Sequence, residues 1–206
     1  MSRKCSPTSI SRTTLWKSSW TDVATVVSGS SVILGLDPGS GLMGYGVVEL
    51  QAGKFRPVDF GAVSTPAGWP LARRLLLLYQ ELCGIIARTD PQCVAVESLF
   101  FNVNARTALA VGQARGVALL SCAQSNREVF EYTPQQVKQG VVGYGRADKR
   151  QVQEMVRLLL KLDKIPRPDD AADALAVAIC HANSLGFRGR LAAAEARGKR
   201  QTERRR

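Results

Sequence analysis

The sequence contains one histidine, no paired cysteines and no long apolar run. The cysteines number five and form no Cys-x-x-Cys pair. This argues against a disulfide framework and favours a reduced, cytosolic compartment. No stretch reaches 18 apolar residues, which excludes a membrane-spanning helix. A chain of 206 residues is expected to form one domain with a substantial core.

The positive charge lies mainly at the two ends of the chain. Of the formal net charge of +11, residues 1–30 contribute +3, residues 187–206 contribute +6, and residues 31–186 only +2. Basic ends suit a polyanionic partner. Residues 1–30 lack the apolar segment of a secretory signal, and we expect a disordered extension, although composition leaves an organelle transit peptide open. We expect residues 187–206 to be a disordered, solvated tail.

The region between the two ends has the pattern of an α/β domain. Apolar runs at 31–37, 43–50 and 55–64 are joined by tight turns, which predicts three antiparallel strands. Two further strands are expected at 92–98 and 128–132, and helices at 69–89, 102–125, 134–141, 147–161 and 169–185. Helical crossovers join parallel strands, so the order predicts a mixed five-stranded sheet flanked by helices.

Two acids end predicted strands. Asp37 follows the first apolar run, and Glu97 follows "CVAV". Either acid alone is most simply the first solvated residue after a strand. In a sheet of this kind, however, chemistry gathers beyond the carboxyl ends of the parallel strands. If the two strands are neighbours, both carboxylates lie within a few ångströms, where like charges repel unless a cation separates them.

The segment "PDDAADALAVAICHA" supplies further acids at the head of the last predicted helix. Asp169 follows a proline and suits a helix N-cap. Asp170 and Asp173, at i and i+3, share one helix face, and Asp169 and Asp173, at i and i+4, do so as well. The surrounding alanines let this helix lie close to the sheet. The spacing alone leaves open whether Asp169 or Asp170 pairs with Asp173.

Carboxylates from three separate elements, without clustered histidine or cysteine, indicate a hard-oxygen site. Magnesium or manganese is the expected cation. Such a cluster suits phosphodiester hydrolysis with two metal ions. His181 follows Asp173 by eight residues, about 12 Å along a helix at 1.5 Å per residue. That is too far to share an ion, and we assign His181 to packing or solvent.

Five segments, in order, resemble the RuvC family of crossover (Holliday) junction endodeoxyribonucleases: "ILGLDPGSGLMGYGVVE", "VAVESLFFNVN", "ALAVGQARGVAL", "TPQQVKQGVVGYGRADKRQVQEMVRLLL" and "DDAADALAVAICHA". The resemblance implies an RNase H-like fold of the retroviral integrase superfamily, a homodimer and a magnesium site. Two Mg²⁺ ions are implied, with Mn²⁺ able to substitute. The implied catalytic metal ligands are Asp37, Glu97, Asp170 and Asp173; Asp170 is preferred over Asp169 because it directly precedes "AADAL".

The resemblance also implies residues that bind DNA. Lys138 and Lys149 match lysines that contact DNA near the scissile phosphate, although without the family each is most simply a surface charge. Phe100 matches an aromatic that stacks on bases at the junction, and we assign the neighbouring Phe101 to packing. The implied reaction is paired, symmetric nicking of four-way DNA junctions in recombination and repair, leaving 5′-phosphate and 3′-hydroxyl ends. A RuvA–RuvB partnership and a bacterial, cytoplasmic location are implied as well.

Two questions stay open from the sequence. Gly112 and Gly116 leave a small-residue stripe on the helix 102–125, which suits either a dimer contact or packing on the sheet. Rival functions are an RNase H or YqgF-like nuclease, which would share the acids, and a junction-binding protein without catalysis. An actin-like ATPase or sugar kinase needs a second lobe and a second phosphate loop, which the chain lacks.

Overall fold

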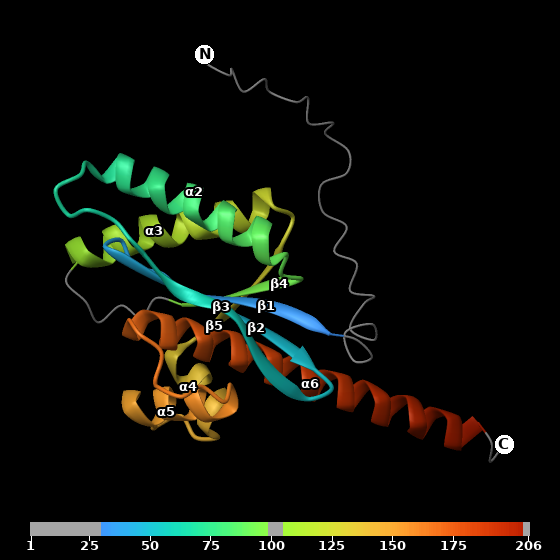
Figure 1. Ribbon diagram of the computed structural model, residues 1–206. Coiled ribbons are helices and arrows are strands. Elements are labelled where there is room, and N and C mark those ends of the chain that lie inside the picture. The colour runs from blue at the N-terminus through green and yellow to red at the C-terminus, as the bar shows by residue number, and fades with distance from the viewer. Residues whose placement is uncertain (1–29, 99–104, 204–206) are drawn as a thin grey trace, which may run out of the picture.

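The computed structural model describes residues 30–98 and 105–203, with side chains described up to residue 186. A five-stranded sheet forms the centre of the domain, in the order β3-β2-β1-β4-β5 (Figure 1). The elements are β1 (Ser31–Asp37), β2 (Leu42–Gln51), β3 (Lys54–Ser64), α2 (Leu71–Thr89), β4 (Cys93–Glu97), α3 (Ala105–Gln124), β5 (Glu128–Tyr132), α4 (Pro134–Val142), α5 (Lys149–Leu159) and α6 (Asp169–Glu203).

The sheet is mixed, as the sequence predicts. β1, β2 and β3 form an antiparallel meander, while β1, β4 and β5 run parallel. The tight β1–β2 and β2–β3 turns permit only antiparallel pairing, and the α2 and α3 crossovers return the chain for parallel pairing. The central strand β1 therefore joins the two halves, and its carboxyl end is flanked by β2 and β4.

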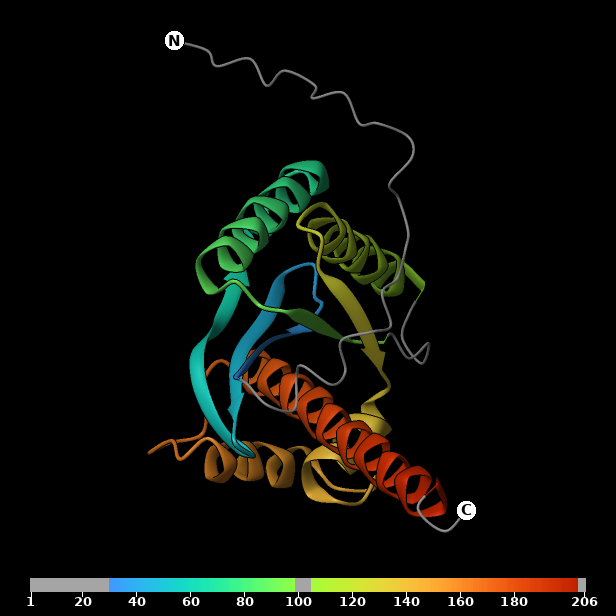
Figure 2. The same cartoon turned by 90° about the vertical axis from the view of Figure 1, so that its right-hand side faces the viewer.

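Helices cover both faces of the sheet. α2 and α3 lie on one face, and α6 lies on the other with α4 and α5 beyond it (Figures 1 and 2). Side chains alternate along each strand, so Leu34 and Leu36 enter the core beneath α2 and α3, while Ile33 enters the core beneath α6. The same alternation places Gly35 and Asp37 on the α6 face.

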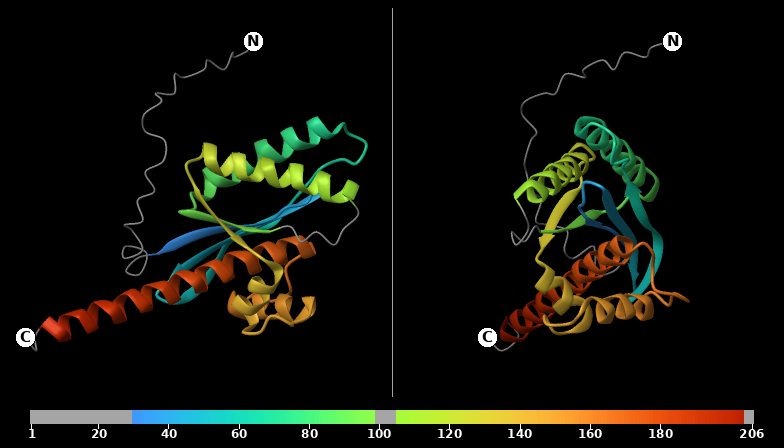
Figure 3. Two further views of the ribbon diagram at one scale, coloured as in Figure 1. Left: turned by 180° about the vertical axis from the view of Figure 1, so that it is seen from behind. Right: turned by 90° about the vertical axis from the view of Figure 1, so that its left-hand side faces the viewer.

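α6 is longer than the sequence predicts. We expected it to end near residue 185, followed by a disordered tail, but the helix continues to Glu203 and extends past the body of the domain (Figure 3). The segment after Gly186 is rich in alanine and arginine, both good helix formers, which favours the continuation. Residues 187–203, expected to belong to a disordered tail, are helical in the structure. The expected disorder of residues 1–29 concerns residues outside the described part of the chain.

Other boundaries differ by a few residues from those expected. α2 begins at Leu71, directly after Pro70, and α5 begins at Lys149, after a capping box formed by Asp148 and Gln151. None of the described helices is long and apolar enough to cross a membrane.

Candidate active site

Asp37 and Glu97 end neighbouring parallel strands. Leu36 pairs with Val96 in the β1–β4 register, so the two acids follow at the same edge of the sheet. Both also point to the α6 face, because Gly35 and Ala95, two residues earlier on each strand, pack beneath α6. The charge of Glu97 contributes to the raised pKa of Asp37, as expected for two carboxyl groups near each other. β1 and β4 are therefore neighbours, which is the condition that the sequence set for their terminal acids to approach each other.

The first turn of α6 reaches the same edge because the sheet presents glycines to it. An ideal Cβ on Gly44, which pairs with Asp37 in the hairpin, would stand 2.0 Å from the carbonyl oxygen of Asp170. A Cβ on Gly35 would stand 2.0 Å from the carbonyl oxygen of Ala174. Only hydrogen at these positions allows the backbones to lie in contact. The alanines of α6 were recognised from the sequence, but the facing glycines of "LGL" (34–36) and "GYG" (44–46) were missed.

The carboxylates influence one another electrostatically. Burial, together with the charges of Glu97, Asp173 and Asp170, raises the pKa of Asp37 to about 8. Burial also raises the pKa of Glu97, with a further contribution from Asp173. The pKa of Asp173 is raised mainly by burial, against the opposing effect of Lys149. Asp37, Glu97, Asp170 and Asp173 therefore form one acid cluster, assembled from β1, β4 and α6.

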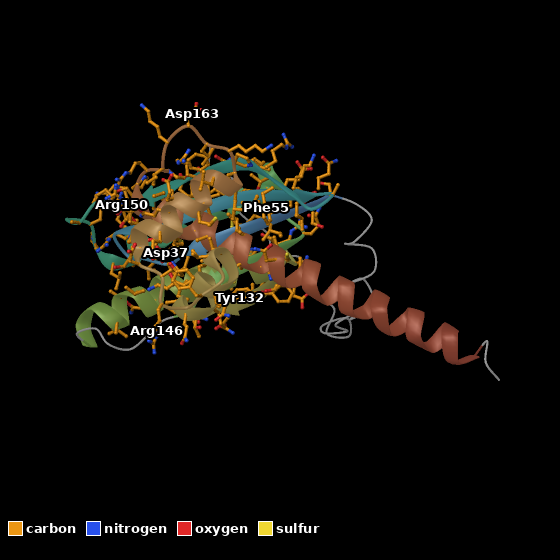
Figure 4. All side chains as sticks on the ribbon, turned by 90° about the horizontal axis from the view of Figure 1, so that it is seen from below. Asp37, Phe55, Tyr132, Arg146, Arg150 and Asp163 are labelled. Carbon is orange, nitrogen blue, oxygen red and sulfur yellow. The ribbon has the colours of Figure 1, made fainter. Side chains whose placement is uncertain are left out.

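Two lysines lie against this acid cluster. Lys149, at the start of α5, places its ammonium 2.8 Å from an oxygen of Asp173, and its charge lowers the pKa of both Asp37 and Glu97. Lys138, on α4, lowers the pKa of Glu97. Both predicted lysines are thus brought to the acids. Viewed from the α4 and α5 side, Asp37 lies near the start of α6 (Figure 4).

Asp169 occupies a different environment from Asp170. Its carboxylate forms an ion pair with Arg167 and lies 3.7 Å from the ammonium of Lys149, and its charge contributes to the raised pKa of Asp173. α6 begins at Asp169, so this residue belongs to the first turn, where the helix dipole favours acids. Asp170, by contrast, contributes to the raised pKa of Asp37. The contacts therefore support Asp170 as the member of the acid cluster.

The acid cluster fits a divalent cation by its chemistry. Its donors are hard carboxylate oxygens, the type that Mg²⁺ and Mn²⁺ prefer. Several carboxylates half-buried together disfavour their own ionisation, and a bound cation removes that penalty. Within residues 30–98 and 108–186, no three acid, cysteine or histidine side chains converge closely enough to enclose an ion. Asp173 is turned toward Lys149 instead.

The remaining predicted residues are two aromatics and one histidine. Phe100 and Phe101 lie outside the described residues. His181 is 1 % exposed and packs in the core, as the sequence predicts. Its ring nitrogens lie 2.7 Å from the Tyr132 hydroxyl and 3.2 Å from the Cys93 sulfur. These contacts hold β4, β5 and α6 together on the α6 face of the sheet.

Comparisons with known proteins agree with this geometry. The family described as "Crossover junction endodeoxyribonuclease RuvC" matches residues 33–181. A relative of that description from Alkaliphilus oremlandii is 57% identical over 156 residues, covering 76% of this chain and 95% of the relative. A relative from Chloroflexus aggregans is 63% identical over 149 residues, covering 72% of this chain and 91% of the relative. The solved structure of Thermus thermophilus RuvC in complex with a Holliday junction substrate has a TM-score of 0.74 and 36% identity, covering 77% of this chain and 97% of that one.

The fold and the acid cluster define a metal-dependent nuclease with an RNase H-like fold. The family match spans more than half of the chain, and close relatives are covered almost completely. The chain belongs to the RuvC family of crossover junction endodeoxyribonucleases. This excludes the RNase H, YqgF-like and ATPase alternatives that the acids alone left open.

Proposed function

We propose that this chain resolves four-way DNA junctions in recombination and repair. It makes paired, symmetric nicks that leave ligatable 5′-phosphate and 3′-hydroxyl ends. The observation that carries the proposal is that four acids from β1, β4 and α6 lie near one edge of the sheet, where the charges of Glu97, Asp170 and Asp173 raise the pKa of Asp37. A relative solved with a Holliday junction substrate supports the choice of DNA.

Asp37, Glu97, Asp170 and Asp173 are the proposed metal ligands, and Mg²⁺ is the proposed cation, two per site, with Mn²⁺ as a substitute. When bound, such ions activate water and stabilise the charge on the leaving oxygen. The raised pKa of Asp37 means that cation binding must release protons near neutral pH. Asp173 must also exchange its ion pair with Lys149 for the cation.

Lys138 and Lys149 are the proposed contacts to the scissile phosphate. Both are cations beside the acid cluster, where a phosphodiester would otherwise meet only negative charge. Lys149 is 56% exposed, so its ammonium can reach a bound strand while staying near Asp173. Phe100 follows Glu97 by three positions in sequence and is the proposed aromatic that stacks on bases at the junction.

We propose a homodimer, because symmetric nicking of two strands suits two active sites related by a two-fold axis. α3 offers a surface for it. Leu109 and Leu120 are 66% and 58% exposed, and a Cβ on Gly116 would meet open space. Ala114 and Ala118, on the opposite side of the helix, are fully buried. Gly116 therefore faces away from the sheet, which favours the dimer contact over internal packing for this glycine.

The RuvA–RuvB branch-migration machinery is the proposed partner, and the bacterial cytoplasm the proposed location. Bacterial relatives described as RuvC support both proposals.

The deciding experiment is cleavage of a synthetic mobile four-way junction with Mg²⁺, with Mn²⁺ and with chelator. Paired nicks at symmetric positions, dependent on the cation, are expected. An RNA–DNA hybrid serves as the comparison substrate and should stay intact. Junction binding without cleavage under every condition would instead indicate a binding protein that has lost catalysis.

A further inference from the structure

The loop that leaves Asp37 is held by two residues outside the acid cluster. Four residues, 38–41, connect β1 to β2, and two of them are glycines. Thr65 lies just beyond the end of β3 and is only 5 % exposed. Its backbone N–H donates to the carbonyl of Gly41 at 2.9 Å, and its hydroxyl donates to the carbonyl of Ser40 at 2.8 Å.

Arg74 completes this arrangement from the first turns of α2. Its Nε–H donates to the Thr65 hydroxyl oxygen at 2.9 Å, and its Nη2 donates to the carbonyl of Ser40. A guanidinium has no acceptor, so the Thr65 hydroxyl can only accept from it and must direct its own hydrogen to a carbonyl. The donor and the acceptor of each of these hydrogen bonds are therefore fixed. Figure 1 shows the β1–β2 turn and the β3–α2 connection at the same end of the sheet.

Arg74 makes no ion pair with any acid among residues whose side chains are described. Its guanidinium donates hydrogen bonds to the Thr65 hydroxyl and to the Ser40 carbonyl of the loop, although four carboxylates lie near the same edge of the sheet. A half-buried guanidinium is tolerated when its N–H groups are hydrogen-bonded, and the partners of Arg74 are Thr65 and the carbonyl of Ser40. Its hydrogen bonds stabilise the conformation of the loop.

We infer that Thr65 and Arg74 are positioning residues for the catalytic carboxylate of Asp37, an inference that rests on the proposed nuclease function. α6 contacts the β1–β2 hairpin from one face, where Asp170 meets Gly44. The Thr65–Arg74 pair ties the same hairpin to α2, which lies on the opposite face. Between them the glycine-containing loop has little freedom, and Asp37 keeps a fixed place relative to Glu97 and Asp170.

Small displacements of a catalytic group are costly: a shift of about 1 Å can lower a rate by about 100-fold. Releasing the loop should therefore reduce turnover and weaken cation binding, while junction binding, which depends on a much larger surface, should change little. This pattern separates positioning from a direct DNA contact, which would act first on junction affinity.

The test compares Thr65→Val, which keeps the shape but removes the hydroxyl, with Thr65→Ser, which keeps the hydroxyl. Turnover at saturating junction, junction Kd in chelator, and the rise in Tm on adding Mg²⁺ are measured. For Thr65→Val we expect turnover to fall about tenfold or more, the Mg²⁺-dependent rise in Tm to shrink, and Kd to stay within about twofold. Thr65→Ser should restore turnover. Unchanged turnover and Tm response in Thr65→Val would overturn the inference.

Arg74 provides an independent test if Thr65→Val fails to fold. Arg74→Lys keeps the positive charge but lacks the two adjacent N–H donors of the guanidinium. Its turnover should therefore fall by as much as that of Arg74→Met. Rescue by lysine would show that charge alone matters and would overturn positioning. Arg73→Met is the matched control, because Arg73 stacks over Trp69 and makes none of these loop contacts. If the wild type cuts no junction, the proposed function fails, whereas the Mg²⁺-dependent Tm response still tests the positioning role.

Discussion

The carbonyl oxygen of Asp170 lies 2.0 Å from the point that a Cβ on Gly44 would occupy. This contact between α6 and β2 brings the acids of the helix to those of the strands. Gly44→Ala must push the start of α6 away from the sheet. We expect the free energy of unfolding to fall by about 1–3 kcal/mol, the usual effect of overpacking, and cleavage to fall with it.

Gly84→Ala is the matched control for that substitution. Gly84 lies within α2, and a Cβ there would meet nothing within 4 Å. Alanine at such a helical position should raise the free energy of unfolding by about 0.5–1 kcal/mol. Denaturant unfolding measures both variants. Equal stability of Gly44→Ala and wild type would mean that the helix can shift at no cost.

Asp173→Asn should abolish cleavage while leaving junction binding in place. The substitution removes one charged oxygen donor, and a loss of turnover of about 100-fold or more is expected on the scale of removing one charge-stabilising group. Binding is scored by gel shift in chelator, cleavage by product analysis with Mg²⁺. Asp163→Asn, at an exposed acid in the connection between α5 and α6, controls for the change in net charge. Full cleavage by Asp173→Asn would make this aspartate structural.

Asp169 and Asp170 should respond differently to the same substitution. Asp170 acts on the pKa of Asp37, whereas Asp169 is paired with Arg167. We expect Asp170→Asn to lose turnover by about 100-fold, and Asp169→Asn to keep most of it. Cleavage rates at saturating junction measure both. The reverse order of effects would place Asp169, and not Asp170, at the metal.

Without divalent cations, the folded protein should lose stability as pH rises. The pKa of Asp37 increases from 3.8 to about 8 on folding, so the folded state holds this proton more tightly than the unfolded chain. The resulting stabilisation is fully present below pH 3.8 and is lost as pH rises toward 8. Burial also raises the pKa values of Glu97 and Asp173, so both contribute to stability with the same dependence on pH. Denaturant unfolding in chelator across this range measures the effect.

Asp37→Asn tests the assignment of that pH dependence. Asparagine resembles the protonated carboxyl, so the variant should be more stable than wild type at about pH 8 and close to it at about pH 4. Adding Mg²⁺ should stabilise wild type at the higher pH and have less effect on Asp37→Asn. An unchanged pH dependence in the variant would assign the titration to other groups.

The basic segment after Gly186 should strengthen DNA binding without serving catalysis. Residues 187–206 carry a net charge of +6, and α6 extends to Glu203 in this region. Removing them should weaken junction binding at low salt. The slope of log K against log salt should become shallower by roughly 0.9 for each phosphate that this segment neutralises in the full chain. Turnover at saturating junction should be preserved. An unchanged salt slope would exclude an interaction of this segment with DNA.

Much of the candidate site could be predicted from local patterns. Asp37 and Glu97 each end an apolar run, and "DDAADAL" places acids at the head of a helix among alanines. Tight turns and helical crossovers also predicted which strands are antiparallel and which are parallel, whereas the pairing of β1 with β4 was only a condition of the prediction and was decided by the structure. The length of α6 could not be predicted from the sequence. A charged, alanine-rich segment is equally compatible with a solvated tail and with a helix when no packing decides between them.

The sequence by itself determined the strands, the mixed order of the sheet and the carboxylates at its edge, because periodicity and loop length act locally along the chain. Only the tertiary structure decided that Gly35 and Gly44 face α6, that β1 lies beside β4, and that Thr65 and Arg74 hold the loop after Asp37. These depend on contacts between residues distant in sequence. No local pattern records such contacts, since they exist only once the sheet and helices have packed.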